Sequence, residues 1–212
     1  MMKGITFGDI HSCDDLNLVL SKVVIPPAVV KTNFVDIPGG DGSVDLTEAL
    51  GEVRYKDREC SFTFTVFPSD DFEEKKTEVS NLLNGRRCKI ILDKDPDYYW
   101  DGRCSIDSYA SDKKINKIVV KATVSPYKLN VNLTKIIVPA GNNVVRTLLN
   151  GRKTVVPTIT NTADATIIFG GNTYTINPGT HRILNIELVE GGNVVTVTST
   201  GDVEFTYQEG DL

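Results

Sequence analysis

Aspartates alternate along the segment Asp93-Lys94-Asp95-Pro96-Asp97, the spacing with which an EF-hand loop presents carboxylate oxygens to calcium. Such a loop needs glycine at its sixth position and glutamate at its twelfth, where this chain has Tyr98 and Cys104. We therefore interpret the segment as a polar hairpin turn whose aspartate side chains bond nearby backbone groups. A metal-dependent enzyme built on these aspartates is the alternative that the segment leaves open.

Histidine chemistry has few possible participants, because the chain contains only His11 and His181. His11 precedes Cys13 and Asp14, which are metal-ligand types, but no second cluster in the sequence completes a coordination shell. His181 follows a turn segment and has no recognisable serine or cysteine partner for nucleophilic catalysis. We expect no enzyme activity, no catalytic residue, no metal and no cofactor.

The glycines of Gly39-Gly40-Asp41-Gly42 would suit a phosphate-binding loop only if a lysine and a helix followed them. Instead the chain runs into Val44-Asp45-Leu46, an extended pattern. Glycine reaches positive φ without a Cβ clash, so this segment is typical of a turn that reverses the chain. The glycine segment is thus predicted to join two extended segments.

The aromatic run Tyr98-Tyr99-Trp100 allows three interpretations. It could be a ligand-stacking platform, it could place alternate rings in a core, or it could be a strand edge covered by a neighbouring subunit. Our candidates for a subunit interface are Val44, Asp45, Leu46, Tyr98, Tyr99 and Trp100. From residue 131 onward all aromatic side chains lie in predicted strands, which gives carbohydrate binding little support.

The charge of the chain argues against a nucleic-acid partner. Its 212 residues include 23 Lys and Arg against 28 Asp and Glu, a net charge of −5. Basic residues gather only in short pairs such as Arg86-Arg87 and Lys113-Lys114, and we interpret both of these as solvated strand ends. Binding of phosphate backbones needs a basic surface, so we expect no specific nucleic-acid binding.

The cysteines Cys13, Cys60, Cys88 and Cys104 lack the CxxC spacing of zinc sites and redox pairs. Isolated cysteines in strands are more often small buried hydrophobic residues. No apolar run reaches the length of a signal peptide or of a membrane span. We therefore expect synthesis in the cytoplasm, reduced thiols and no membrane association.

Periodicity predicts the elements that position these residues. Phe62, Phe64 and Val66 alternate with polar residues in Cys60 to Phe67, as in a strand with one face in a core. Residues 69–85 are predicted to form a helix, with Ser69 or Asp70 as N-cap and Gly85 after its end. Its apolar stripe consists of Phe72, Val79, Leu82 and Leu83.

The composition changes near residue 130. Of the first 130 residues 39 are charged, but only 12 of the remaining 82 are. After this point short β-rich runs alternate with glycine turns, among them a predicted strand at Ile183 to Leu188. We predict a mainly β chain with two domains. Residues 1–130 would form a β-sandwich or split sheet with one α-helix and a hairpin, and residues 131–212 a small antiparallel β-sandwich of galectin-like or jelly-roll type.

Several ordered segments carry a family resemblance: ITFGDIHSCDDLNLVL, VDIPGGDGSVDLTEALGEVRYKDRECSFTFTV and DPDYYWDGR. Together they resemble the N-terminal domain of phage distal tail proteins, often called Dit, over about residues 4–130. The resemblance implies a structural protein in the virion, at the tail tip of a long-tailed phage or prophage, made in the bacterial host cytoplasm. It implies a homo-oligomer, expected to be a hexameric ring, built by residues 1–130, with residues 131–212 projecting outward.

The partners that the resemblance implies are the tail tube protein, the tail-associated lysin or fibre hub, and a receptor-binding protein, in a baseplate or tail tip whose channel DNA may cross. The alternative is a carbohydrate-binding module, in which residues 131–212 contact cell-wall glycans of the host.

Overall fold

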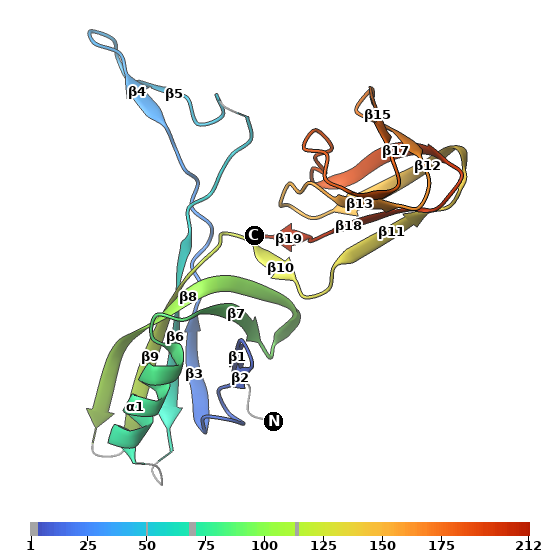
Figure 1. The fold of residues 1–212 in the computed structure, drawn as a ribbon. Helices are drawn as coiled ribbons and strands as arrows, with labels where there is room; N and C mark the ends of the chain where they lie inside the picture. The colour runs from blue at the N-terminus through green and yellow to red at the C-terminus, as the bar shows by residue number, and fades with distance from the viewer. Residues whose placement is uncertain (1–3, 50, 68–70, 113–114) are drawn as a thin grey trace. The chain divides into compact units, whose positions relative to one another are not determined.

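The structure, a computed structural model, describes residues 4–49, 51–67, 71–112 and 115–212. The chain divides into two units, Met1–Pro126 and Tyr127–Leu212. We call them the N-terminal unit and the C-terminal unit (Figure 1). In the described residues no helix has the length and apolarity that crossing a membrane requires.

One antiparallel sheet forms the body of the N-terminal unit, in the order β2-β1-β7-β8-β9-β6-β3. Its strands are β1 (Ile5–Phe7), β2 (Ile10–His11), β3 (Leu18–Val24), β6 (Arg58–Val66), β7 (Arg87–Leu92), β8 (Asp95–Asp112) and β9 (Ile115–Val124). β6 pairs with β9 rather than with β7, its neighbour in sequence. The longest strands, β8 and β9, therefore lie in the middle of the sheet.

The sheet curls so that its inner face buries a single core. Along β6 the burial alternates, and Phe62, Phe64 and Val66 are almost inaccessible, which confirms the predicted strand. Phe7 on β1 contacts Phe62 and Phe64, with ring centroids 5.9 and 6.1 Å apart. Because four strand-to-strand steps separate β1 from β6, this contact requires strong curvature.

The predicted helix is confirmed as α1 (Phe72–Leu83). Asp71 is its N-cap, with its carboxylate accepting from the backbone N of Glu73 at 2.8 Å. The predicted caps, Ser69 and Asp70, lie outside the described residues. Gly85 follows the helix with φ +80°, a conformation that glycine adopts without strain. Val79 and Leu83 enter the core, and Phe72 and Leu82 pack against it.

A hairpin of β4 (Phe34–Asp36) and β5 (Ser43–Asp45) leaves the sheet as a long arm (Figure 1). We call residues 31–54 the arm. Its base is closed by a bridge between Val30 and Tyr55. Gly39 and Gly42 have φ of +80° and +75° in the turn between the two strands, as predicted.

The C-terminal unit consists of two four-stranded antiparallel sheets, β11-β18-β13-β16 and β12-β17-β14-β15, and a short pair of β10 with β19. The strands are β10 (Lys128–Asn130), β11 (Thr134–Val138), β12 (Gly141–Asn150), β13 (Thr158–Asn161), β14 (Ala165–Phe169), β15 (Asn172–Ile176), β16 (Gly179–His181), β17 (Gly191–Ser199), β18 (Val203–Tyr207) and β19 (Gly210–Asp211). The two sheets enclose one core that includes Leu148, Ile167, Val197 and Phe205. The predicted mainly β fold class is confirmed.

One predicted strand of this unit is wrong. Residues 183–188 form no strand but a turn, in which the backbone N of Ile186 donates to the carbonyl of Ile183 at 3.0 Å. Ile186 and Leu188 are fully buried. Their apolar side chains fill the core from a loop, and an apolar run of this length does not distinguish a loop from a strand.

Candidate assembly surfaces

The turn within the acidic segment 93–97 is shorter than predicted. β7 ends at Leu92 and β8 begins at Asp95, so the turn consists of Asp93 and Lys94. Asp93 Oδ2 accepts a hydrogen bond from the backbone N of Gly4 at 2.6 Å, which joins this hairpin to β1. Within the described ranges, no group of three or more His, Cys, Asp and Glu side chains is placed to hold a metal ion.

His11 links two turns of the N-terminal unit. Its Nδ1 lies 2.8 Å from Asp14 Oδ2, and its Nε2 lies 3.3 Å from Asp93 Oδ2. A Cβ at Gly4 would lie 2.5 Å from the same Nε2, so the ring needs glycine there. Cys13 points to a backbone carbonyl instead, with Sγ 3.2 Å from the oxygen of Leu18. The arrangement fastens the edge of the sheet, and it brings His11 and Asp14 together while Cys13 points elsewhere.

In the C-terminal unit, His181 lies on β16 and its Nε2 is 2.7 Å from the carbonyl oxygen of Asn177. The aromatic side chains from residue 131 onward are buried or half-buried: Phe169, Tyr174, Phe205 and Tyr207. Stacking on a sugar needs an exposed ring face, so these rings serve the core of the sandwich.

The four cysteines are free thiols. Burial raises the pKa of Cys60 to about 11. Cys88 and Cys104 approach each other across β7 and β8, with 3.8 Å between their Sγ atoms. The hydrogen bond lowers the pKa of the Cys88 thiol, and together with burial it raises the pKa of Cys104. Cys60 and Cys104 are buried, as predicted, whereas Cys13 and Cys88 are half-buried.

The aromatic run lies on β8 and points mainly into its own subunit. Trp100 is 6% exposed and belongs to the core, and Tyr99 is 7% exposed. Lys89 Nζ lies 4.5 Å from the centroid of the Tyr99 ring. Burial and then the charge of Asp101 raise the pKa of Tyr99. Tyr98 is half-buried. One copy already covers most of Tyr99 and Trp100, which leaves little of either ring for contact with a neighbouring subunit.

The arm carries the other three interface candidates, Val44, Asp45 and Leu46, and all of them are accessible. Val44 is 43% exposed and Leu46 is 38% exposed. The Asp45 carboxylate accepts from the backbone N of Thr47 at 2.9 Å, and the hydrogen bonds from Thr47 lower the pKa of Asp45. A charged carboxylate therefore lies beside exposed apolar side chains.

Opposite residues in the hairpin define two faces, since directly paired residues point to the same side. Phe34 pairs with Asp45, and Asp36 pairs with Ser43. We call these four the carboxylate face of the arm. Val35 pairs with Val44 on the other side. Every residue of β4 and β5 is exposed, Phe34 to 58%.

Sequence reasoning missed a hollow of about 610 Å³ in the N-terminal unit. It lies where the end of α1 meets the sheet, and we call it the β8 hollow. Its charged lining residues are two arginines, Arg87 and Arg103, and two aspartates, Asp57 and Asp101, and Asn84, Ser105 and Thr123 lie beside them. Pairing places Arg87 opposite Arg103, and Arg103 opposite Thr123. The sequence carries no local signal for this hollow, because Arg87 and Arg103 are brought together only by the pairing of β7 with β8.

Among solved structures, the chain is similar to the crystal structure of Dit (gp 19.1) of phage SPP1. The two align over 100% of both chains with a TM-score of 0.71 and 15% sequence identity. The chain has the Dit fold. The resemblance to distal tail proteins that the sequence indicated is thus confirmed at the level of the fold.

The similarity to SPP1 Dit is one of structure and not of sequence. No protein-family model matches the chain, and no curated protein matches it. SPP1 Dit is described as a paradigm of the hub adsorption apparatus in phages that infect Gram-positive bacteria. Full coverage means that the likeness to Dit includes both units of the chain.

Proposed function

We propose that this protein is a structural component of a phage tail tip, where it serves as a hub in the manner of a Dit protein. The observation that carries the proposal is the alignment with SPP1 Dit over the whole of both chains. A fold alone does not fix a function, so the surfaces of the molecule must agree with the role. The exposed apolar side chains of the arm agree with it, because large exposed apolar patches mark interaction sites.

In the proposed assembly six copies form a ring, the N-terminal domains (residues 1–130) build its annulus, and residues 131–212 form an outward module. The ring joins the tail tube protein to the tail-associated lysin or fibre hub and carries receptor-binding proteins. A net charge of −5 suits a ring through which DNA passes, because an acidic protein does not retain phosphate backbones by counterion release.

Immunogold electron microscopy of virions from a phage or induced prophage that encodes this chain tests the proposal. Antibodies against the purified chain are expected to label the tail tip, and antibodies against the tail tube protein of the same particle give the control pattern along the tail. Virions without label, or with label on the capsid alone, would contradict the proposed role.

A further inference from the structure

Two free thiols of the N-terminal unit face each other. The sulfur atoms of Cys88 and Cys104 lie 3.8 Å apart, although the two residues are 16 positions apart in the chain. The sulfur–sulfur bond of a disulfide is about 2.05 Å long, so an approach of about 1.8 Å would bring the two atoms to bonding distance. The backbone around the pair decides whether the two residues can make this approach.

The register of β7 and β8 places both thiols on the same face of the sheet. Cys88 is paired with Gly102, and Cys104 lies two residues further along β8, so it points to the same side as Gly102. Because Gly102 has no side chain, no side chain directly opposite Cys88 separates it from Cys104. In a regular ladder, however, the Cα atoms of such diagonal neighbours are about 7–8 Å apart, which is more than a disulfide usually spans.

A β-bulge next to the pair accounts for the closer approach. Gly85 and Arg86, which precede β7, both face the single residue Cys104. The backbone N of Gly85 donates to the Cys104 carbonyl at 2.8 Å, and the backbone N of Cys104 donates to the Arg86 carbonyl at 2.8 Å. Gly85 has φ +80°, which is the conformation of the first residue in a glycine bulge. Such a bulge bends its strand and increases the local twist, so the diagonal distance differs from that of a regular ladder.

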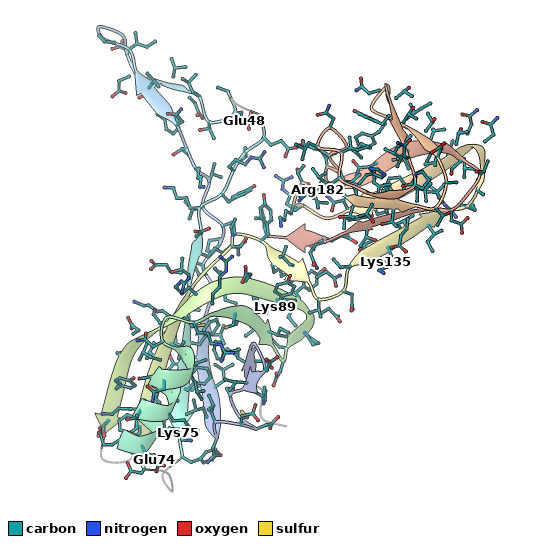
Figure 2. All side chains as sticks on the ribbon, viewed as in Figure 1. Glu48, Glu74, Lys75, Lys89, Lys135 and Arg182 are labelled. Carbon is teal, nitrogen blue, oxygen red and sulfur yellow. The ribbon has the colours of Figure 1, made fainter. Side chains whose placement is uncertain are left out.

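Cys88 is accessible to a reagent, whereas Cys104 is not. Cys88 is half-buried and Cys104 is fully buried. Cys88 is the second residue of β7, next to Lys89, which Figure 2 labels. A Cβ placed at Gly8 would lie 3.6 Å from the Cβ of Cys88, so the neighbouring chain presents a glycine at this point. A small oxidant would therefore react first at Cys88.

A positive charge lies beside the accessible thiol. The Nη2 atom of Arg86 is 3.9 Å from the position of a Cβ at Gly8, the same position that neighbours Cys88. The hydrogen bond from Cys104 lowers the pKa of Cys88, and the charge of Arg86 acts in the same direction. Both favour the thiolate, which is the form that attacks a disulfide.

We propose that Cys88 and Cys104 form an intramolecular disulfide when the protein meets a small disulfide such as oxidised glutathione, and that the bond fastens the start of β7 to β8. The Cys88 thiolate attacks one sulfur of the oxidant, forms a mixed disulfide and releases one small thiol. Cys104 then gives up its proton, attacks the sulfur of Cys88 and displaces the second small thiol. Two electrons and two protons pass from the protein to the oxidant, which becomes two thiols.

The bond itself does not depend on the hub role, but the occasion for its formation rests on the proposed function. The cytoplasm keeps thiols reduced, so the newly made chain holds Cys88 and Cys104 as thiols. A component of the virion leaves the cytoplasm and its reductants when the host cell opens. The disulfide is therefore expected in the released particle and not in the newly made chain.

Oxidation of the purified full-length protein with oxidised glutathione at pH 8 tests the bond. After the remaining thiols have been blocked with N-ethylmaleimide, peptide mass spectrometry without reduction is expected to find Cys88 linked to Cys104, with Cys13 and Cys60 blocked. C13S removes the other half-buried cysteine and should not change this result. C104S should stop at a glutathione adduct on Cys88, because the second thiol is absent. Blocked thiols at both positions, a lasting adduct in the original protein, or links to another cysteine or another copy would overturn the proposal.

Thermal unfolding tests whether the bond fastens the strand. The oxidised protein is expected to unfold at a midpoint about 5 °C or more above that of the reduced protein, because the cross-link restricts the unfolded chain. C88S/C104S should have the same midpoint after either treatment. An equal midpoint for the oxidised and reduced forms of the original protein would contradict the proposed fastening of β7.

The two proposals can fail separately. Virions and host lysates prepared with N-ethylmaleimide present are expected to contain the disulfide and the free thiols, respectively. Thiols in labelled tail tips would remove the proposed occasion and leave the hub role in place. A disulfide in the purified protein without label on the virion would remove the hub role and leave the bond.

Discussion

The rings of Phe7 and Phe62 meet edge to face, 5.9 Å apart between centroids and at 77°, although β1 and β6 are four strand-to-strand steps apart in the sheet. In a flat sheet these strands would lie about 19 Å apart. The contact therefore closes the curl of the N-terminal unit around its core.

Removal of this closing contact should destabilise the protein strongly. F62A is expected to lower the free energy of unfolding by about 3–5 kcal/mol, because a buried phenylalanine loses its packing and leaves a cavity. Its neighbour Thr63 points to the opposite face, so T63A is the control and should change the free energy by at most about 0.5 kcal/mol. Urea unfolding followed by circular dichroism measures both. Equal effects would show that the core lies elsewhere.

The helix cap gives a second prediction. The Asp71 carboxylate accepts from two backbone N–H groups at the start of α1, those of Glu73 and Glu74. D71A should therefore cost about 1 kcal/mol in the free energy of unfolding, and D71N much less. N81A, at an exposed position later in the helix, is the control and should be neutral or slightly stabilising. A thermal unfolding midpoint unchanged in D71A would disprove the cap.

The cysteines should differ in reactivity, because the thiolate is the reacting form. The hydrogen bond from Cys104 lowers the pKa of Cys88, and burial raises the pKa of Cys60 to about 11. During an iodoacetamide pulse at pH 8, Cys88 should be alkylated well before Cys60 and Cys104. Peptide mass spectrometry measures the alkylated fraction of each cysteine. In C104S the stronger hydroxyl donor should preserve the reactivity of Cys88, whereas C104A should reduce it. Alkylation of Cys60 and Cys88 at one rate would refute the assignment.

Ionisation of Tyr207 is expected to lower the stability of the folded protein at alkaline pH. Its hydroxyl donates to the carbonyl of Leu149, and burial followed by the charge of Glu209 raises the pKa of Tyr207 to about 12. A raised pKa favours the neutral phenol in the folded state. The stability that Tyr207 contributes is therefore complete below its ordinary pKa of about 10 and is lost as the pH rises toward 12.

Two variants isolate this effect. Y207F should lower the free energy of unfolding at neutral pH by about 1 kcal/mol and weaken its decline above pH 10. Y174F, a half-buried position in the same unit, should leave that decline unchanged. Chemical unfolding at a series of pH values measures both. If the free energy of unfolding of Y207F fell above pH 10 as steeply as that of the original protein, another group would cause the decline.

Local patterns in the sequence were enough to predict the strand at Cys60 to Phe67, observed as β6 (Arg58–Val66), as well as the helix and the glycine turn of the arm. Each of these predictions depends on residues that are close in the sequence. The alternation of Phe62 and Phe64 with polar residues indicated the strand, and the glycine at position 85, which has φ +80° in the structure, indicated the end of the helix. The strand predicted at 183–188 was wrong because Ile186 and Leu188 fill the core from a loop.

The β8 hollow could not be predicted because it depends on pairing between strands that are distant in the sequence. Arg87 and Arg103 are opposite each other only when β7 pairs with β8 in the observed register, and Thr123 joins them through β9. The burial of Tyr99 and Trp100 depends on the curl of the sheet, which no local pattern specifies. Exposure of the arm is likewise a property of its length and of its distance from the rest of the unit.

The most direct test of the account is the mass of the protein in solution, measured by light scattering over a wide range of concentration. The account predicts a closed assembly with six times the 23.3 kDa mass of the chain. A single copy at every concentration, or growth into open polymers without a limiting size, would contradict it.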